Sequence, residues 1–326
     1  MKNILEIDGL TVHYLTEHPD RPVHAVENVS FCVKEGESLG LVGESGCGKT
    51  ATCRTILRLL AANAEIMGGE VRYKGTNLLA LSEEEMRAIR GREIGMIFQE
   101  PMTALNPVLS IRRQMYEALD KTLSQEEKQR RAVELLSMVG IPDPEKRLKE
   151  YIHQFSGGMR QRAMIAITLA SQPKLLLADE PTTALDVTIQ AQIVHLLKTL
   201  RRQLHMSLIL ITHDLGVVSQ MCDRVVVMYA GQIMETAEVH DLFRDPRHPY
   251  TLGLMGSIPK GGNAVQRLRP IPGSPVDLTA VPTGCPFAPR CAYADERCRK
   301  KFPVQYEAAP GHLVRCWRQD PKKEVL

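Results

Sequence analysis

The chain has 326 residues, of which 44% are hydrophobic and 24% are charged, and its formal net charge is +3. This length is enough for one large domain with a small one, or for two of medium size. The weak, well-mixed charge gives no argument for a nucleic-acid partner, and we expect none. No apolar run approaches the ~18 residues that span a bilayer. The first residues do not resemble a signal peptide, so we expect the chain to stay in the cytoplasm.

Residues 4–250 alternate between strand-like and helix-like stretches. Short continuous apolar runs, which are typical of parallel strands buried on both faces, occur at 39–42, 175–178, 208–211 and 225–228. Ser82 and Ser124 each stand three residues before a glutamate, which predicts a capping box and a helix start. The second of these helices is predicted to run to Val139, with Gly140 as its stop. Because residues 100–165 contain no convincing strand, we expect a helical insertion there.

A glycine-rich phosphate loop follows the first apolar run. Residues 43–50 match the pattern G-x-x-x-x-G-K-[ST] between a strand and a helix. Its glycines allow backbone N–H groups to surround phosphate, and the helix N-terminus adds partial positive charge. Lys49 is predicted to reach the β- and γ-phosphates, and the Thr50 hydroxyl to bind Mg²⁺. The predicted ATP-contacting residues are Gly43, Glu44, Ser45, Gly46, Cys47, Gly48, Lys49, Thr50 and Ala51.

Cys47 lies inside this loop, close to a helix N-terminus and to Lys49. Both neighbours favour the thiolate, so we predict that Cys47 reacts with alkylating reagents and that ATP protects it. The alternative is that the position only requires a small residue.

Two acids follow the apolar run at 175–178. Side chains at the carboxyl end of a parallel strand face the crevice where ligands bind. Asp179 is therefore predicted to hold Mg²⁺, directly or through water, and Glu180 to polarise the attacking water as general base. The alternative is a pair of acids that cap a helix.

The end of the chain is rich in proline and carries four of its eight cysteines: Cys285, Cys291, Cys298 and Cys316. Such a segment builds little apolar core, and four thiolates in it indicate a metal site that contributes folding energy. The spacing contains no C-x₂-C pair typical of zinc and matches neither ferredoxin pattern. Two disulfides are disfavoured in the cytoplasm. Spacing alone leaves Zn²⁺ and an iron–sulfur cluster comparable, with free thiols or disulfides behind them.

Several further motifs, in the same order and spacing, resemble those of ATP-binding-cassette (ABC) ATPases. Residues 155–159, Phe-Ser-Gly-Gly-Met, are similar to the signature LSGGQ, with Phe and Met in place of Leu and Gln. Gln99 resembles the Q-loop glutamine that contacts Mg²⁺, and His213 the switch histidine. Residues 183–186 resemble the D-loop, opening with Thr rather than Ser. Tyr14 lies where the family places an aromatic side chain that stacks on adenine.

This resemblance implies an α/β fold, the P-loop NTPase ABC ATPase fold. It would have an antiparallel β-subdomain, a mainly parallel core sheet and a helical subdomain at about 100–165. Residues 1–255 would form the ABC domain and 256–326 a small irregular, cysteine-rich, metal-binding C-terminal domain. The catalytic residues implied are Glu180, His213 and Gln99, and the Mg²⁺ ligands Thr50, Gln99 and Asp179. The further ATP-contacting residues implied are Tyr14, Ser156, Gly157, Gly158 and Asp186, of which Ser156–Gly158 would complete the site on another subunit.

A narrower resemblance rests on residues 99–107, residues 247–251 and the cysteine-bearing tail. These look like the nucleotide-binding subunits of bacterial oligopeptide and dipeptide importers, nearest the D-type ATPase subunit of dipeptide transporters. The resemblance implies an ATPase that powers peptide uptake from the cytoplasmic face of the membrane. Its partners would be two permease subunits and a second ATPase subunit, identical or related. An extracytoplasmic substrate-binding protein would act indirectly.

Some of these ATPases carry a 4Fe–4S cluster in the tail, which favours the cluster over Zn²⁺ here. Two alternative functions stay open. Importer ATPases for nickel or glutathione share much of the pattern, and a non-transport ABC ATPase acting on DNA or ribosomes is the second alternative.

Overall fold

The computed structural model describes residues 2–18, 20–183, 185–257, 270–280 and 282–321. It contains two compact units. The first unit joins Met1–Ala80 to Ile211–Leu326, and the second is formed by Leu81–Leu210. The chain therefore leaves the first unit after residue 80 and re-enters it at residue 211.

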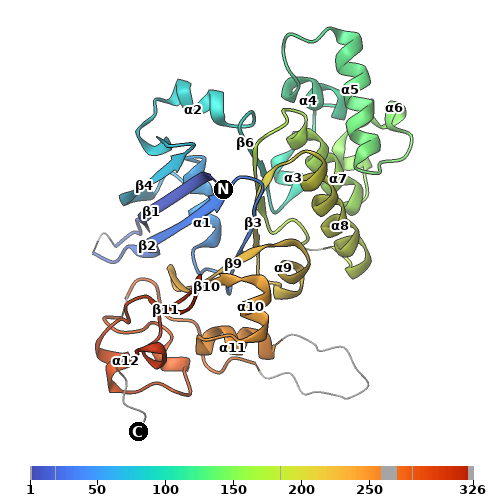
Figure 1. Ribbon diagram of the computed structural model, residues 1–326. Helices are drawn as coiled ribbons and strands as arrows, with labels where there is room; N and C mark the ends of the chain where they lie inside the picture. Colours follow the sequence, from blue (N-terminus) through green and yellow to red (C-terminus); the bar gives the residue numbers. More distant parts are fainter. Residues whose placement is uncertain (1, 19, 184, 258–269, 281, 322–326) are drawn as a thin grey trace, which may run out of the picture. The chain divides into compact units, whose positions relative to one another are not determined.

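An antiparallel sheet of order β2-β1-β4-β5 lies in the first unit, drawn in blue in Figure 1. Its strands are β1 Asn3–Tyr14, β2 Val23–Lys34, β4 Ala64–Tyr73 and β5 Thr76–Asn77. Leu5, Leu10 and Val12 of β1 are fully buried, so one face of this sheet belongs to the core. The predicted antiparallel β-subdomain is present.

The strands of the first unit's second sheet follow the order β11-β12-β10-β9-β3. Their bounds are β3 Ser38–Val42, β9 Arg224–Tyr229, β10 Gln232–Glu238, β11 Tyr306–Ala309 and β12 His312–Val314. β3 and β9 are parallel and almost entirely buried, as their continuous apolar runs predict. β10 is antiparallel to β9, and the tail strand β12 is antiparallel to β10. The tail is thus less irregular than predicted, because it extends this sheet.

The helices of the first unit are short: α1 Lys49–Ile56, α9 Leu215–Met221, α10 Val239–Arg244, α11 Pro249–Gly256 and α12 Glu296–Lys300.

A buried carboxylate also connects the tail strand β12 to β10. Glu235 on β10 has no exposed surface, and His312 Nε2 of β12 lies 2.7 Å from its Oε1. Backbone N–H groups of Arg247 and His248 donate to the same carboxylate at 2.7 and 3.0 Å. A buried carboxylate costs free energy unless its oxygen atoms are hydrogen-bonded, and these three partners supply those hydrogen bonds.

The second unit contains the parallel pair β6 Ile94–Ile97 and β7 Leu175–Asp179, while β8 Ser207–Thr212 starts in this unit and ends in the first. Between β6 and β7 the described residues form helices and no strand, as predicted for 100–165. The helices of the whole second unit are α2 Glu83–Ile89, before β6, then α3 Pro101–Ala104, α4 Ile111–Ala118, α5 Gln125–Met138, α6 Pro144–Arg147 and α7 Gly157–Leu169, and finally α8 Val187–Gln203, after β7. The capping boxes at Ser82 and Ser124 are confirmed. Among the described residues, every helix is too short or too polar to cross a bilayer.

Candidate functional site

The phosphate loop connects β3 to α1 in the first unit, and two of its glycines are required by close backbone contacts. A Cβ atom on Gly43 would lie 2.2 Å from the Met228 carbonyl oxygen. A Cβ atom on Gly48, whose φ is 97°, would lie 2.2 Å from the Ala25 carbonyl oxygen. The loop is therefore seated directly on β9 and β2. Its position at the N-terminus of α1 suits an anionic ligand.

Lys49 is only 4% exposed, and its ammonium group lies inside the loop. Nζ donates to the carbonyl oxygens of Gly43 and Glu44 at 2.7 and 2.8 Å, and it lies 3.5 Å from Cys47 Sγ.

The prediction of a thiolate at Cys47 is wrong. Burial of this side chain, of which 4% is exposed, raises the pKa of the thiol, and the nearby Lys49 opposes that rise only in part. Cys47 fills space against Gly43 instead.

Two other predicted ATP-site residues also lie in the first unit. Tyr14 is at the end of β1, where burial raises the pKa of its hydroxyl and Arg54 of α1 opposes the rise. Its hydroxyl therefore lies within electrostatic reach of the helix that follows the phosphate loop. His213 is exposed at the carboxyl end of β8, directly before Asp214, which caps α9.

The second unit brings Glu180 and Gln99 together. Asp179 ends β7 and is 1% exposed, and Glu180 follows it with a positive φ of 45°. Glu180 Oε2 accepts a hydrogen bond from Gln99 Nε2 at 3.4 Å and one from the Thr183 hydroxyl at 2.8 Å. A left-handed backbone costs energy at a non-glycine residue and is common at functional sites. The contact of Thr183 with Glu180 could not be read from the sequence, which predicted Thr183 only as part of the D-loop.

The signature residues occupy the N-terminus of the 13-residue helix α7. Ser156 is exposed and caps this helix, accepting the Met159 N–H at 3.4 Å. A Cβ atom on Gly158 would lie 3.0 Å from the Ile189 side chain, a tight contact that would require Ile189 to shift. Phe155 is 2% exposed, so the larger ring at this position is accommodated in the core. Asp186 caps α8 through the Ile189 N–H at 2.9 Å.

Comparison with known proteins identifies the family. The ABC transporter family model matches residues 26–183, and the model of the oligopeptide/dipeptide transporter C-terminal region matches residues 234–298. The dipeptide transport ATP-binding protein DppD of Bacillus subtilis (strain 168) is 49% identical over 99% of this chain and 97% of its own length. The oligopeptide transport ATP-binding protein OppD of the same organism is 48% identical over 98% and 89%.

This chain belongs to the oligopeptide and dipeptide transporter ATP-binding subunits of the ABC family. Among solved structures, the ATP-binding cassette MJ0796 in a dimeric post-hydrolysis state with ADP and Pi matches with a TM-score of 0.64. The two chains are 29% identical, and the match covers 72% of this chain and 98% of that one. The predicted ABC ATPase fold is confirmed.

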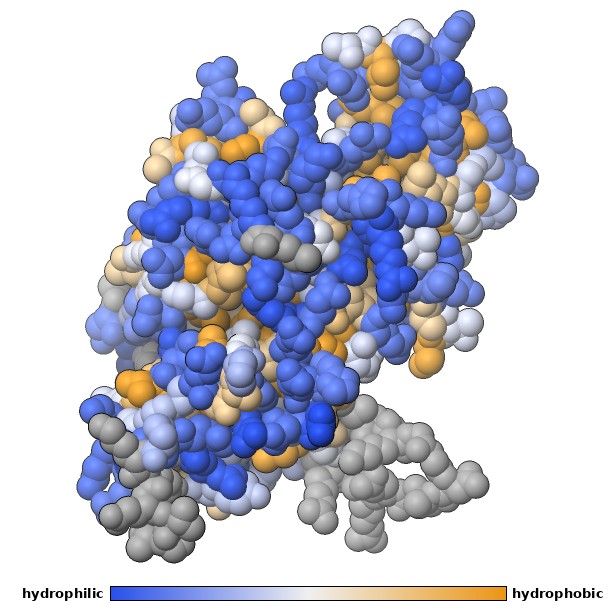
Figure 2. All heavy atoms as spheres, viewed as in Figure 1, coloured by the Kyte–Doolittle hydropathy of each residue, from blue (hydrophilic) through white to orange (hydrophobic). Residues whose placement is uncertain are grey.

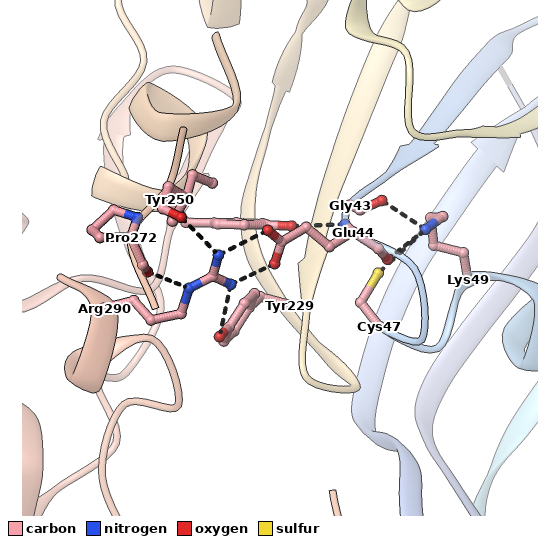
Figure 3. A network of polar contacts seen from close by, with 9 residues as sticks. Gly43, Glu44, Cys47, Lys49, Tyr229, Tyr250, Pro272 and Arg290 are labelled. Carbon is pink, nitrogen blue, oxygen red and sulfur yellow. Dashed lines mark hydrogen bonds and ion pairs between the residues drawn. The ribbon is translucent and has the colours of Figure 1, made fainter. Parts of the chain in front are cut away.

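The tail of this ABC subunit contacts its own phosphate loop. Arg290 is buried, with 5% of its side chain exposed, and its guanidinium forms a bidentate ion pair with the Glu44 carboxylate (Figure 3). Nη1 donates to Glu44 Oε2 at 2.6 Å and Nη2 to Oε1 at 3.0 Å. The remaining donors reach the Pro272 carbonyl at 2.9 Å and the Tyr229 hydroxyl at 3.3 Å. A planar guanidinium suits this arrangement, because it satisfies several acceptors at once.

A second tether comes from α11. The hydroxyl of Tyr250 accepts the backbone N–H of Glu44 at 2.8 Å (Figure 3). Its ring packs against Tyr229 and Phe287, with centroid distances of 4.7 and 5.3 Å. Burial lowers the pKa of His248 to about 4, so its neutral Nδ1 accepts the Tyr250 N–H at 3.0 Å and caps the helix. Glu44 is therefore fixed through both its side chain and its backbone.

Replacing Arg290 by Ala should lower the free energy of unfolding by about 2–4 kcal/mol, since it leaves the partly buried Glu44 carboxylate without its partner. ATP affinity should fall as well, because the loop loses a fixed point. Chemical denaturation and ATP titration measure the two effects. Lys300→Ala is the matched control: it removes an exposed pair with Glu296 that contributes no more than about 1 kcal/mol. An Arg290→Ala variant as stable as the control would contradict the role of this contact.

The four tail cysteines form a group that we call the cysteine quartet: Cys285, Cys291, Cys298 and Cys316. All four are free thiols, which rules out disulfides among them in this structure. Burial and then repulsion between the thiols raise the pKa of Cys285 to about 12, and burial raises that of Cys316 to about 11. The thiols are thus close enough to influence one another. No three of these sulfur atoms lie within 4.8 Å of one another, although every cysteine of the quartet belongs to the described residues.

Proposed function

We propose that this chain binds and hydrolyses ATP to power the uptake of dipeptides and oligopeptides through separate permease subunits. The observation that carries the proposal is the near-full-length similarity to DppD and OppD, which extends through the tail. The phosphate loop and the Glu180 cluster supply the groups that hydrolysis requires.

In the proposed mechanism, the loop amides and Lys49 hold the β- and γ-phosphates, and Tyr14 stacks on adenine. By resemblance to ABC ATPases, Thr50, Gln99 and Asp179 would supply oxygen ligands to Mg²⁺, which neutralises phosphate charge when bound. Glu180 accepts the proton of the attacking water. Hydrogen bonds from Thr183 and Gln99 hold the Glu180 carboxylate in position. We assign His213 to the γ-phosphate by its resemblance to the switch histidine.

We infer that a complete site needs two copies of the cassette, or this chain and a related one. Ser156, Gly157 and Gly158 open α7 at the surface, where the helix N-terminus favours anions. They would bind the γ-phosphate held by the phosphate loop of the partner subunit, and Asp186 of the D-loop would contact the nucleotide as well. The dimeric relative with ADP and Pi is consistent with this arrangement.

We assign the permease contact, at the cytoplasmic face of the membrane, to the helices of the second unit. Three large apolar side chains of this unit are exposed: Met102 by 41%, Val108 by 76% and Tyr151 by 40%. The backbones of Ser110 and Tyr151 are bridged, which brings Tyr151 near the segment that contains Val108. Figure 2 shows hydrophobic side chains among hydrophilic ones over α4 and α5, at the upper right. The assignment itself rests on the resemblance to importer ATPases, whose helical subdomain contacts the permease. Gln99 lies at the start of the helical segment 100–165, and its side-chain amide donates a hydrogen bond to the Glu180 carboxylate. Gln99 therefore connects this helical segment to the proposed general base.

Substrate choice can be tested by uptake in cells that lack this chain and regain it from a plasmid. We expect restored uptake of a labelled dipeptide, competed by unlabelled dipeptides and tripeptides. Unchanged dipeptide uptake, combined with restored nickel or glutathione uptake, would replace the peptide proposal by one of those alternatives.

We also propose that the cysteine quartet holds a 4Fe–4S cluster in a C-terminal segment spanning 256–326. Thiolates suit iron–sulfur clusters and Zn²⁺ alike. The thiol of Cys285 interacts electrostatically with those of Cys291, Cys298 and Cys316, so the four side chains belong to one group. The resemblance to peptide-importer ATPases that carry a 4Fe–4S cluster in the tail favours the cluster over Zn²⁺. Cys291 follows Arg290 directly, so a cluster would hold the guanidinium against Glu44.

Anaerobic reconstitution should yield about four irons and four sulfides per chain, with a brown colour and an EPR signal on reduction. Cys298→Ser should lose them, whereas Cys32→Ser, a free cysteine outside the quartet, should not. A colourless wild-type protein with one tightly held zinc would overturn the cluster proposal and leave the Zn²⁺ alternative.

A further inference from the structure

A second group of metal-binding side chains lies on the antiparallel sheet of the first unit, far along the sequence from the cysteine quartet. It consists of His13 on β1 with His24 and Glu27 on β2. Glu27 Oε1 lies 2.6 Å from His13 Nε2 and 2.5 Å from His24 Nδ1. The three ligand atoms all lie within 4.8 Å of one another. No part of the ATP mechanism uses these residues.

The local backbone explains why the three side chains converge. His13 and His24 are direct cross-strand partners, so they project from the same face of the sheet. On a regular strand, residues 24 and 27 would point to opposite faces. The register shifts here, because Val12 pairs with Val26 while His13 pairs with His24. This bulge leaves Ala25 and Val26 both buried and returns Glu27 to the face of His24.

The chemistry of this group fits a late first-row divalent metal. Two imidazoles and one carboxylate are the ligand types that Zn²⁺ binds, with N and O distances of about 2.0–2.2 Å. Tetrahedral ligand atoms then lie roughly 3.3 Å apart, so the carboxylate needs to withdraw by less than about 1 Å from the two rings. The side chains of His13, His24 and Glu27 are 15%, 27% and 24% exposed, so an ion can enter from solvent and a water molecule would complete its coordination.

A second carboxylate lies on the same face. Glu65 of β4 is the cross-strand partner of His13 on the side opposite to His24. It is exposed and stands outside the three-residue group, so it adds negative charge beside the site rather than a fixed ligand. The rings of His13 and His24 are 4.1 Å apart and tilted by 54°, an arrangement in which both present a nitrogen atom to Glu27.

We propose that His13, His24 and Glu27 form a Zn²⁺ site that is separate from both the ATP site and the cysteine quartet. Bound Zn²⁺ would cross-link β1 to β2 next to Ala25, the residue whose carbonyl packs against Gly48 of the phosphate loop.

The test uses tag-free, full-length protein without nucleotide, titrated with Zn²⁺ alone and with Co²⁺ as a spectroscopic probe. Wild type should bind one metal ion more than His13→Gln and His24→Gln. Because Gln retains a polar side chain on a half-exposed strand, we expect both variants to fold, and circular dichroism checks this. The cobalt spectrum of the additional ion should show d–d bands without thiolate charge transfer, which separates this site from the quartet.

His18→Ala is the matched control, since His18 is an exposed histidine in the same β1–β2 connection that lies outside the group. It should bind as much Zn²⁺ as wild type. Glu27→Gln should weaken the site by more than the roughly 10–100-fold that loss of an outer-sphere partner costs. Equal metal binding by wild type and both histidine variants would overturn the proposal. So would an equal loss in His18→Ala, or full affinity in Glu27→Gln.

Discussion

Glu180→Gln should reduce the rate of ATP hydrolysis by about 10²–10⁴-fold, the usual contribution of a general base, while ATP binding is retained. The amide is isosteric and can still accept the hydrogen bonds of Thr183 and Gln99, but it cannot take a proton. Phosphate release under single-turnover conditions measures the change. With MgATP the variant should also accumulate as a dimer in size-exclusion chromatography. The reason is that the ATP-bound, closed dimer dissociates only after hydrolysis, which this variant performs too slowly.

Thr183→Ala serves as a graded comparison for this result. It leaves the carboxylate in place and removes the 2.8 Å hydrogen bond that orients it, so its rate should lie between those of wild type and Glu180→Gln. If Glu180→Gln hydrolysed ATP within a few-fold of wild type, Glu180 would not be the base. A variant that stayed monomeric with MgATP at micromolar concentration would contradict the trapped dimer.

Lys49→Ala should weaken ATP binding on the order of 100-fold, since a hydrogen bond to a charged group contributes about 1.5–3 kcal/mol and this ammonium also provides charge. Lys49 is almost wholly buried and already oriented into the loop, so little side-chain entropy is lost when phosphate binds. Isothermal titration with ATP gives the affinity directly.

Lys49→Met keeps the length of the side chain and removes only its charge and donors, so it should resemble Lys49→Ala in affinity. Lys121→Ala, an exposed lysine in the second unit, is the control for a general loss of positive charge. ATP affinity unchanged in both Lys49 variants would show that the loop amides suffice and that the role given to Lys49 is wrong.

The sequence predicted the features that depend on neighbouring residues. The apolar runs at 39–42 and 175–178 became the buried strands β3 and β7. The spacing of Ser124 from Glu127 became a capping box, because both partners lie within one helical turn. These signals are local, so composition and spacing are enough to find them.

Features that join distant segments could not be predicted. Arg290 and Glu44 are 246 positions apart, and neither residue carries a local sign of the other. The pairing of β12 with β10 is of the same kind. The error at Cys47 has a different cause: sequence showed the nearby Lys49 but not the burial, and burial has the larger effect on the pKa of the thiol.

Transport can be measured in proteoliposomes that contain the permease pair, this chain and its ATPase partner, supplied with the peptide-binding protein. Peptide-loaded binding protein should stimulate ATP hydrolysis, and labelled dipeptide should accumulate on the ATP side. With Glu180→Gln in this chain, both hydrolysis and accumulation should fall at least to the level supported by the partner's own site. Peptide accumulation at the wild-type rate in the Glu180→Gln complex would contradict the account of this chain as the ATPase that drives import.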